Sequence, residues 1–161
     1  MSQETQTWLN TMTLIGFTEQ RGHAWHYRAA QQVDEPNHYP GPVPVEDVRR
    51  RLFDWKVIEG DVWSTAVTMD DDGVATFTVS DANRKAMLRP PGAFGPDDPG
   101  AILGISKAGY EGHDYEEWLL EQVATILDDD LAIGSAGLLK AGAVAWAVSY
   151  THLTLPTICS V

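Results

Sequence analysis

Residues 55–69 have the pattern of an extended chain, and from Val62 onward apolar residues are interspersed with serine and threonine, a pattern that continues over 74–79. In the first part of this segment the apolar positions include Val62, Trp63, Ala66 and Val67. Residues 70–73 read Asp-Asp-Asp-Gly, and Gly73 can adopt the positive φ that a tight turn requires. The pattern predicts a β-hairpin with strands over 55–69 and 74–79.

Prolines and glycines mark the predicted loops. Residues 81–100 contain Pro90-Pro91-Gly92 and Gly95-Pro96, and this segment is predicted to be one long loop. Residues 33–44 carry four prolines and one glycine, and they are predicted to be another loop.

Two segments have the spacing of amphipathic helices. Val45, Val48 and Leu52 recur at i, i+3 and i+7. This spacing predicts a short helix from Pro44 to Phe53, since proline suits the first helical position. Asp114 and Glu117 have the spacing of a capping box, and apolar residues follow at helical intervals. A second helix is therefore predicted from Asp114 to Leu127.

Three further apolar segments, 101–106, 131–139 and 143–148, have the length of β-strands. Hairpins combined with two main helices predict an α+β fold with a mixed, mostly antiparallel sheet. The segment 143–148 is continuously apolar, as in an interior strand, so we expect a further strand to pair with it.

Composition and charge limit the classes of partner that this protein is expected to bind. The chain has 161 residues, 43% of them hydrophobic, and a net charge of −12, which fits about one acidic globular domain. Such a charge repels phosphate backbones at long range, although a local basic face remains compatible with it. Residues 1–10 lack the pattern of a signal peptide, and no apolar run approaches the ~20 residues that span a bilayer. With a single cysteine, Cys159, these features predict a cytoplasmic protein without a membrane partner.

Six of the eleven basic residues fall in two short stretches. They are Arg49, Arg50, Arg51, Arg84, Lys85 and Arg89. If the loop 81–100 lies beside the first helix, these side chains form one patch that binds phosphates or single-stranded nucleic acid. Trp55 or Phe94 would then stack on a base. The alternative is that the arginines complement the helix C-terminus and that the loop residues are solvated.

Histidines concentrate at His23, His26 and His38. Histidines at i and i+3 can share a metal ion, and His38 would add a third ligand. No acidic residue lies between His23 and His26, so this is not the His-Glu-x-x-His zinc pattern. The alternative is an aromatic and histidine-rich strand packed on a core.

Other catalytic motifs are missing from the sequence. The acidic runs 70–72 and 128–130 lack the alternating spacing of a calcium loop, which favours solvated surface. No serine lies in a Gly-x-Ser-x-Gly elbow, and the glycines near residue 134 are not followed by the Lys-Ser or Lys-Thr of a phosphate loop. The sequence therefore favours a non-enzymatic protein with no cofactor.

The stretch 104–146 resembles one family. It reads Gly-Ile-Ser-Lys-Ala-Gly-Tyr over 104–110, then the helix from Tyr115, then Ala-Gly-Leu-Leu-Lys-Ala-Gly-Ala-Val-Ala-Trp over 136–146. This order is similar to that of the phage/plasmid-like protein family built on domain of unknown function 932. Trp25-His26 and Asp54-Trp55-Lys56-Val57 also resemble that family, and the similarity covers most of 12–147.

The resemblance implies a phage or plasmid gene expressed in a bacterial cell, and it supplies no catalytic residues. Residues 148–157, Val-Ser-Tyr-Thr-His-Leu-Thr-Leu-Pro-Thr, resemble a translated sequencing adapter instead. Members of the family are also longer than this chain. We therefore expect residues 1–147 to be the N-terminal part of a single domain and 148–161 to be a non-native tail.

Three functions follow as hypotheses. The first is a non-enzymatic phage or plasmid accessory protein that binds nucleic acid or a replication or recombination protein. The second is a protein-interaction module that modulates host or defence proteins. The third is a metal-dependent enzyme whose ligands include His23, His26 and His38, with its site completed by residues outside this chain. The oligomeric state stays open.

Overall fold

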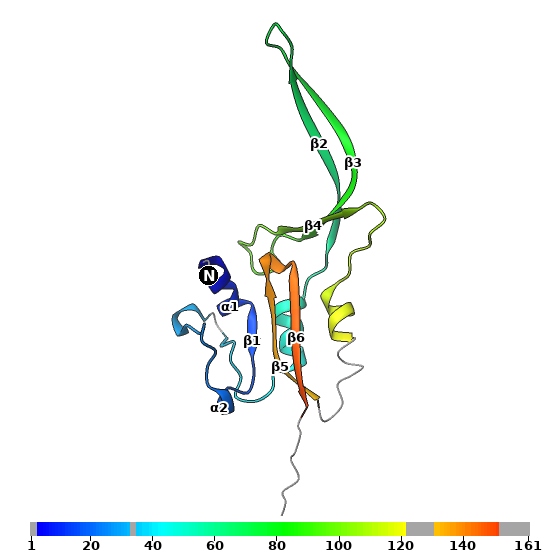
Figure 1. The fold of residues 1–161 in the computed structure, drawn as a ribbon. Helices are drawn as coiled ribbons and strands as arrows, with labels where there is room; N and C mark the ends of the chain where they lie inside the picture. Colours follow the sequence, from blue (N-terminus) through cyan, green and yellow to red (C-terminus); the bar gives the residue numbers. More distant parts are fainter. Residues whose placement is uncertain (1–2, 33–34, 122–130, 152–161) are drawn as a thin grey trace, which may run out of the picture. The chain divides into compact units, whose positions relative to one another are not determined.

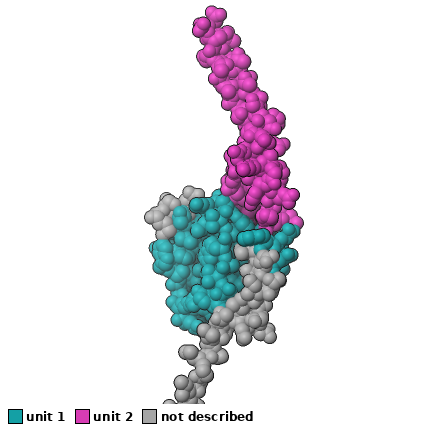
Figure 2. Space-filling view, turned by 45° about the vertical axis from the view of Figure 1, so that its right-hand side comes forward, with its two compact units in different colours: residues 1–54, 115–161 teal, residues 55–114 magenta. Residues whose placement is uncertain are grey.

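The computed structural model describes residues 3–32, 35–121 and 131–151. Their contacts divide the chain into two compact units, residues 1–54 with 115–161 (unit 1) and residues 55–114 (unit 2), coloured separately in Figure 2. Each unit contains one three-stranded antiparallel sheet (Figure 1). Short helices accompany the sheets, so the predicted α+β class is confirmed. In the described part of the chain, no helix is long and apolar enough to span a bilayer.

The sheet of unit 1 has the strand order β1-β5-β6. The three strands are β1 (Thr13–Ile15), β5 (Leu131–Leu139) and β6 (Val144–Thr151). The turn between β5 and β6 is a 3-10 turn, η4 (Lys140–Gly142). Two of the predicted strands are thereby confirmed. Within the described residues β6 is an edge strand, and a further strand beside it stays a prediction.

The expected boundary at residue 148 falls inside β6. Val148 pairs with Ser135, and the ladder continues to Thr151 opposite Leu131. The sheet thus includes four residues of the segment that resembles adapter sequence. That residues 148–161 are a non-native tail stays a prediction.

The first predicted helix is confirmed as two consecutive pieces, α3 (Val45–Val48) and the π-helical η2 (Arg49–Phe53). Of the three residues whose spacing predicted an inner side, Val48 and Leu52 are buried and Val45 is half-buried. Phe53, outside that spacing, is buried as well. Three other short helices precede it, α1 (Gln3–Thr11), α2 (Thr18–Arg21) and η1 (Ala29–Gln31).

The second predicted helix begins later than its capping box indicated. The structure has a π-helical turn, η3 (Glu116–Leu120), with no side-chain cap, and residues 122–127 of the prediction lie outside the described residues. Asp114 is not the cap, because its Oδ1 accepts a hydrogen bond from the Val57 N–H at 2.8 Å. The carboxylate is thus used within unit 2 instead of at the helix terminus.

The core of unit 1 gathers side chains from segments distant in sequence. Its most deeply buried apolar members are Leu14, Val43, Val48, Leu52, Phe53, Ile133, Ala136 and Leu138. Two buried asparagines form hydrogen bonds with backbone groups around this core. Asn10 Nδ2 donates to the His26 carbonyl (2.8 Å) and its Oδ1 accepts from the Arg28 N–H, while Asn37 Nδ2 donates to the Thr13 carbonyl (2.7 Å). These bonds fix the loops beside α1 without leaving those polar groups unpaired.

Unit 2 is built on β2 (Ile58–Met69), β3 (Ala75–Arg89) and β4 (Ala101–Lys107), in that order. The predicted hairpin is confirmed. The predicted loop over 81–100 is wrong in its first half, because β3 passes through an irregularity and continues to Arg89. Residues 82–84 of β3 lie opposite the single residue 62 of β2, and Asn83 within them has φ 50°. Pairing of the two strands resumes at Lys85, opposite Asp61.

The outer part of the hairpin has only two strands. β4 pairs with residues 84–89 of β3, so residues 63–69 and 75–81 pair solely with each other. We call this two-stranded part the arm. Figure 1 shows β2 and β3 continuing well beyond the end of β4.

Candidate interaction surface

The strand register of the arm separates its side chains into two chemically different faces. Residues directly opposite each other in an antiparallel pair point to the same side of the sheet. One face is formed by the pairs Trp63·Asp81, Thr65·Val79, Val67·Phe77 and Met69·Ala75. The other is formed by Ser64·Ser80, Ala66·Thr78 and Thr68·Thr76. We call the first the apolar arm face.

The five large side chains of the apolar arm face are all open to solvent. Trp63, Val67, Met69, Phe77 and Val79 are between 55% and 69% exposed. With about 150–250 Å² for an aromatic side chain and somewhat less for the others, the face presents on the order of 600 Å². Monomeric proteins rarely expose a larger apolar patch, and patches of this size mark interaction sites. Beyond the end of β4 these two strands lack the third strand or packed layer that usually stabilises a hairpin in water.

The tip of the arm is a turn stabilised by one aspartate. Asp70 Oδ1 accepts hydrogen bonds from the Val74 N–H (2.7 Å) and the Asp72 N–H (3.1 Å), and Gly73 has φ 79°. The three aspartates are exposed, in agreement with the solvated surface that the sequence favoured. They are the only charged residues between Asp61 and Asp81, so the tip is purely acidic.

The base of the arm carries charges of both signs. Lys85 Nζ donates to Glu59 Oε2 at 2.6 Å, and this contact raises the pKa of Lys85 and lowers that of Glu59. Arg84 lies opposite Lys107 in the β3–β4 ladder, and both are exposed. Neither forms an ion pair with the residues that the structure describes. Lys85 is therefore neutralised locally, whereas Arg84 and Lys107 form a small basic site.

Arg89 belongs to the interior of unit 2. Its guanidinium forms an ion pair with Asp98, and both side chains are nearly inaccessible. Asp98 also accepts bonds from the Phe94 and Gly100 N–H groups, and the Arg89 hydrogen bond holds its pKa below the ordinary range. Phe94 stacks on Arg89 at 4.4 Å and contacts the edge of Trp55. Both predicted stacking aromatics thus have internal contacts in this unit.

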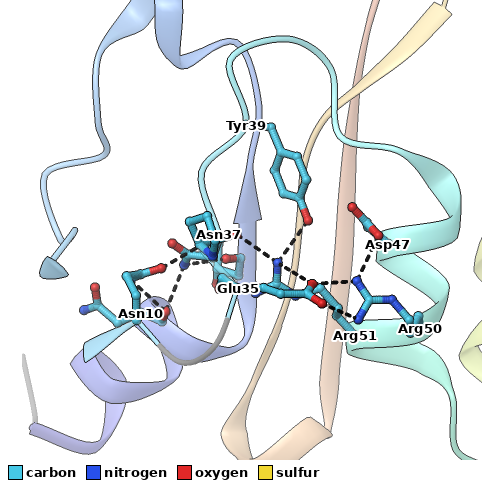
Figure 3. Close-up of polar contacts among 10 residues, drawn as sticks. Asn10, Glu35, Asn37, Tyr39, Asp47, Arg50 and Arg51 are labelled. Carbon is cyan, nitrogen blue, oxygen red and sulfur yellow. Dashed lines mark hydrogen bonds and ion pairs between the residues drawn. The ribbon is translucent and has the colours of Figure 1, made fainter. Parts of the chain in front are cut away.

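The three consecutive arginines of η2 contact acidic groups of unit 1, and Figure 3 shows the contacts of Arg50 and Arg51. Arg50 Nη2 donates to Glu35 (2.6 Å) and to Asp47 (3.0 Å), and the Arg50 hydrogen bonds lower the pKa of both carboxylates. Arg51 donates to the Tyr39 hydroxyl at 3.0 Å, and Arg49 is paired with Glu116 at 2.8 Å and with Glu46. The positive charge of this segment is largely neutralised by its own unit.

The six predicted basic residues are thus divided between the units. Arg49, Arg50 and Arg51 lie in unit 1, and Arg84, Lys85 and Arg89 lie in unit 2. Neither unit contains the complete patch that the sequence predicted. Of the six, Arg84 is the exposed residue that has no acidic partner within the described part of the chain.

The three predicted metal ligands do come together. The ring centroids of His23 and His26 lie 5.2 and 6.3 Å from that of His38. However, His38 Nε2 accepts a bond from the Ala24 N–H (3.0 Å), so Nδ1 carries the proton and donates to Asn37 Oδ1 (2.7 Å). Both nitrogens are occupied, and no group of three potential ligands in the described residues has a metal-binding arrangement. The alternative is only partly matched: His26 is buried, but His23 and Trp25 are exposed, and this segment forms turns instead of the expected strand.

Burial lowers the pKa of two histidines in this cluster. Desolvation, then the charges of His23 and His26, lower the pKa of His38 to about 4. Burial and then Arg28 lower the pKa of His26, whose Nδ1 has no hydrogen-bond partner. Both rings are therefore neutral at physiological pH.

The apolar arm face was not singled out by sequence reasoning, although a signal for it exists. Alternation in both strands places their large residues on one face, and no cation lies between Val62 and Ser80. What the sequence left open is whether another layer covers that face.

No protein-family model, curated protein or solved structure matches this chain. The resemblance to the phage/plasmid-like family therefore stays a prediction.

Proposed function

We propose that this protein is a protein-interaction module that binds a protein partner through the apolar arm face. The observation that carries this proposal is the exposure of Trp63, Val67, Met69, Phe77 and Val79 on one side of a two-stranded ribbon. A face of this kind favours a protein surface, since aromatic and methionine side chains are enriched at the centres of protein interfaces.

The size of the face is sufficient for specific binding. At about 25 cal/mol per Å², burying roughly 600 Å² contributes on the order of 15 kcal/mol before costs. Association costs about 4–15 kcal/mol in lost translational and rotational freedom. The balance therefore favours a partner that covers the whole face over one that covers only part of it.

Nucleic-acid binding was also suggested by the sequence, but of the six predicted basic residues only Arg84 lacks an acidic partner in the described part of the chain. The tip is acidic, and Arg49, Arg50 and Arg51 are bonded to carboxylates or to other acceptors of their own unit. A phosphate backbone requires cations that remain available to it. This hypothesis stays a prediction, as does the setting of a phage or plasmid accessory protein in a bacterial cytoplasm.

Site-specific photo-crosslinking in cells that carry the gene tests the proposal. A photoreactive residue replaces Phe77 on the apolar arm face or, as a matched control, its neighbour Thr78 on the opposite face. We expect discrete protein adducts from position 77 and few from position 78. Equal labelling from both positions, or none from position 77, would contradict a protein-docking role for this face.

A further inference from the structure

We propose that the partner of the apolar arm face is a second copy of this chain. In this arrangement two arms pack face to face and antiparallel, with the tip of each at the base of the other. The inference rests on the proposed function, because it names the occupant of the same face. The two are separable, since a different protein on the face would satisfy only the first.

The face is complementary to itself when one copy is reversed. Along the arm its four rows run from Trp63·Asp81 to Met69·Ala75. A two-fold axis at the middle places Trp63 over Met69 of the second copy, a favourable contact of an aromatic ring with a thioether. The same operation places Phe77 over Val79 and Val67 over Thr65, so large side chains meet smaller ones. Two inner faces of this kind form a sandwich core about 10 Å thick.

Charge selects the reversed orientation. In a parallel dimer the two tips, each with three aspartates and no cation, would lie side by side and repel each other. In the antiparallel dimer each tip instead meets a base of mixed charge. That base carries Glu59, Asp61, Asp81, Arg84, Lys85 and Lys107. Arg84 and Lys107, opposite each other and unpaired within the described residues, supply the positive charge that a neighbouring acidic tip requires.

The area is appropriate for such a dimer. A standard interface removes about 800 Å² from each partner, and the large side chains of the apolar arm face supply roughly 600 Å² of it. Thr65, Ala75 and the adjacent backbone lie in the same rows and add to the contact. The pairing also converts a marginal two-stranded ribbon into a four-stranded, two-layer structure.

The first experiment measures self-association of the purified chain by sedimentation velocity over a range of concentrations. We expect a reversible dimer. V67T and F77T together remove apolar area but keep β propensity, so the dimer dissociation constant should rise at least about tenfold. The matched pair A66S and T78S, one row away on the opposite face, should change it by less than about twofold. Circular dichroism of both variants checks that the fold is retained.

The second experiment measures orientation with a spin label on Asp72→Cys in a Cys159→Ser background. In the antiparallel dimer the two tips are about ten residues apart along the arm, roughly 34 Å at ~3.4 Å per residue. In a parallel dimer they nearly touch. A tip-to-tip distance on the order of 30–40 Å supports the proposal, and a distance below about 20 Å overturns it.

The outcomes also separate this inference from the proposed function. If the purified chain is monomeric, or if it dimerises equally well with V67T and F77T, the second-copy inference is wrong. If position 77 nevertheless yields adducts of another mass in cells, the docking surface itself stands. An adduct of twice the chain mass from position 77 supports both, and the absence of any adduct there overturns both.

Discussion

In unit 1, Leu14, Val48 and Phe53 are at most 1% exposed, whereas on the arm of unit 2 Phe77 is 69% exposed. Both regions alternate or repeat apolar residues with good periodicity. In unit 1, the buried apolar side chains come largely from segments 13–15, 43–53 and 133–138, which are far apart in sequence. The arm consists of two strands that are adjacent in sequence, and each of them pairs only with the other. The comparison teaches that a regular apolar pattern specifies a face but not what covers it.

The largest expected difference concerns two phenylalanines. Phe53→Ala should lower the free energy of unfolding of unit 1 by about 3–5 kcal/mol, because a buried aromatic ring is lost and a cavity remains. Phe77→Ala, in dilute monomer, should change stability by about 0.5 kcal/mol or less. Urea unfolding of both variants makes the comparison. Equal losses would show that the arm face is covered within the monomer.

The base of unit 2 should behave like a core, unlike its arm. Arg89→Met leaves the Asp98 carboxylate buried without its cation, at a cost of about 3 kcal/mol. Lys85→Met, the control, removes an exposed pair with Glu59 and should cost clearly less. Hydrogen exchange of unit 2 amides measures both effects. Because the Asp98 pKa is lowered in the fold, this stability is present above its ordinary value of 3.8 and is lost as pH falls below it.

In unit 1 a smaller effect is expected from pH. The pKa of His38 is about 4 in the fold against 6.5 ordinarily, so unfolding takes up a proton between these values. Stability is complete above about pH 6.5 and declines as pH falls toward 4, by on the order of 1 kcal/mol after solvent screening. His38→Gln should flatten this slope in thermal melts.

The smallest effect is expected at the exposed arginines. Arg50→Gln removes contacts with Glu35 and Asp47 at the solvent-exposed surface, where ion pairs contribute little and are screened by salt. We expect a small fall in melting temperature at low salt that disappears at high salt. A large fall that persists in high salt would show that this cluster stabilises unit 1 as a buried pair would.

Several local features of the fold were predictable because they depend on neighbouring residues. Gly73 after three aspartates indicated the hairpin turn, and Val48 and Leu52 indicated the inner side of a helix. The loop prediction for 81–100 failed in its first half because the breakers that indicated it, Pro90-Pro91-Gly92 and Gly95-Pro96, all lie at or after residue 90. Before them the strand accommodates Asn83 as an irregularity and resumes pairing. The capping-box prediction failed because Asp114 binds Val57, fifty-seven residues away, instead of the helix that follows it.

The candidate sites were predicted from residue type alone. The contacts of those residues in the structure indicate different roles. The arginines 49–51 were predicted as a phosphate site, but carboxylates from Glu35 and Glu116 occupy them. His38 was predicted as a ligand, but Ala24 and Asn37 use both ring nitrogens. Partners at these separations cannot be found from periodicity, because the pairing follows from how distant segments meet.

The sequence by itself determined the acidic charge, the hairpin with its acidic tip, and the two-residue alternation that gives the arm one apolar and one Ser/Thr side. Two features were decided only by the tertiary structure. The pairing of β4 with β3 ends at Arg84, and the apolar arm face stays open to solvent. The reason is physical. Alternation and turn residues act over a few neighbouring positions, whereas burial is a property of which distant surfaces come into contact.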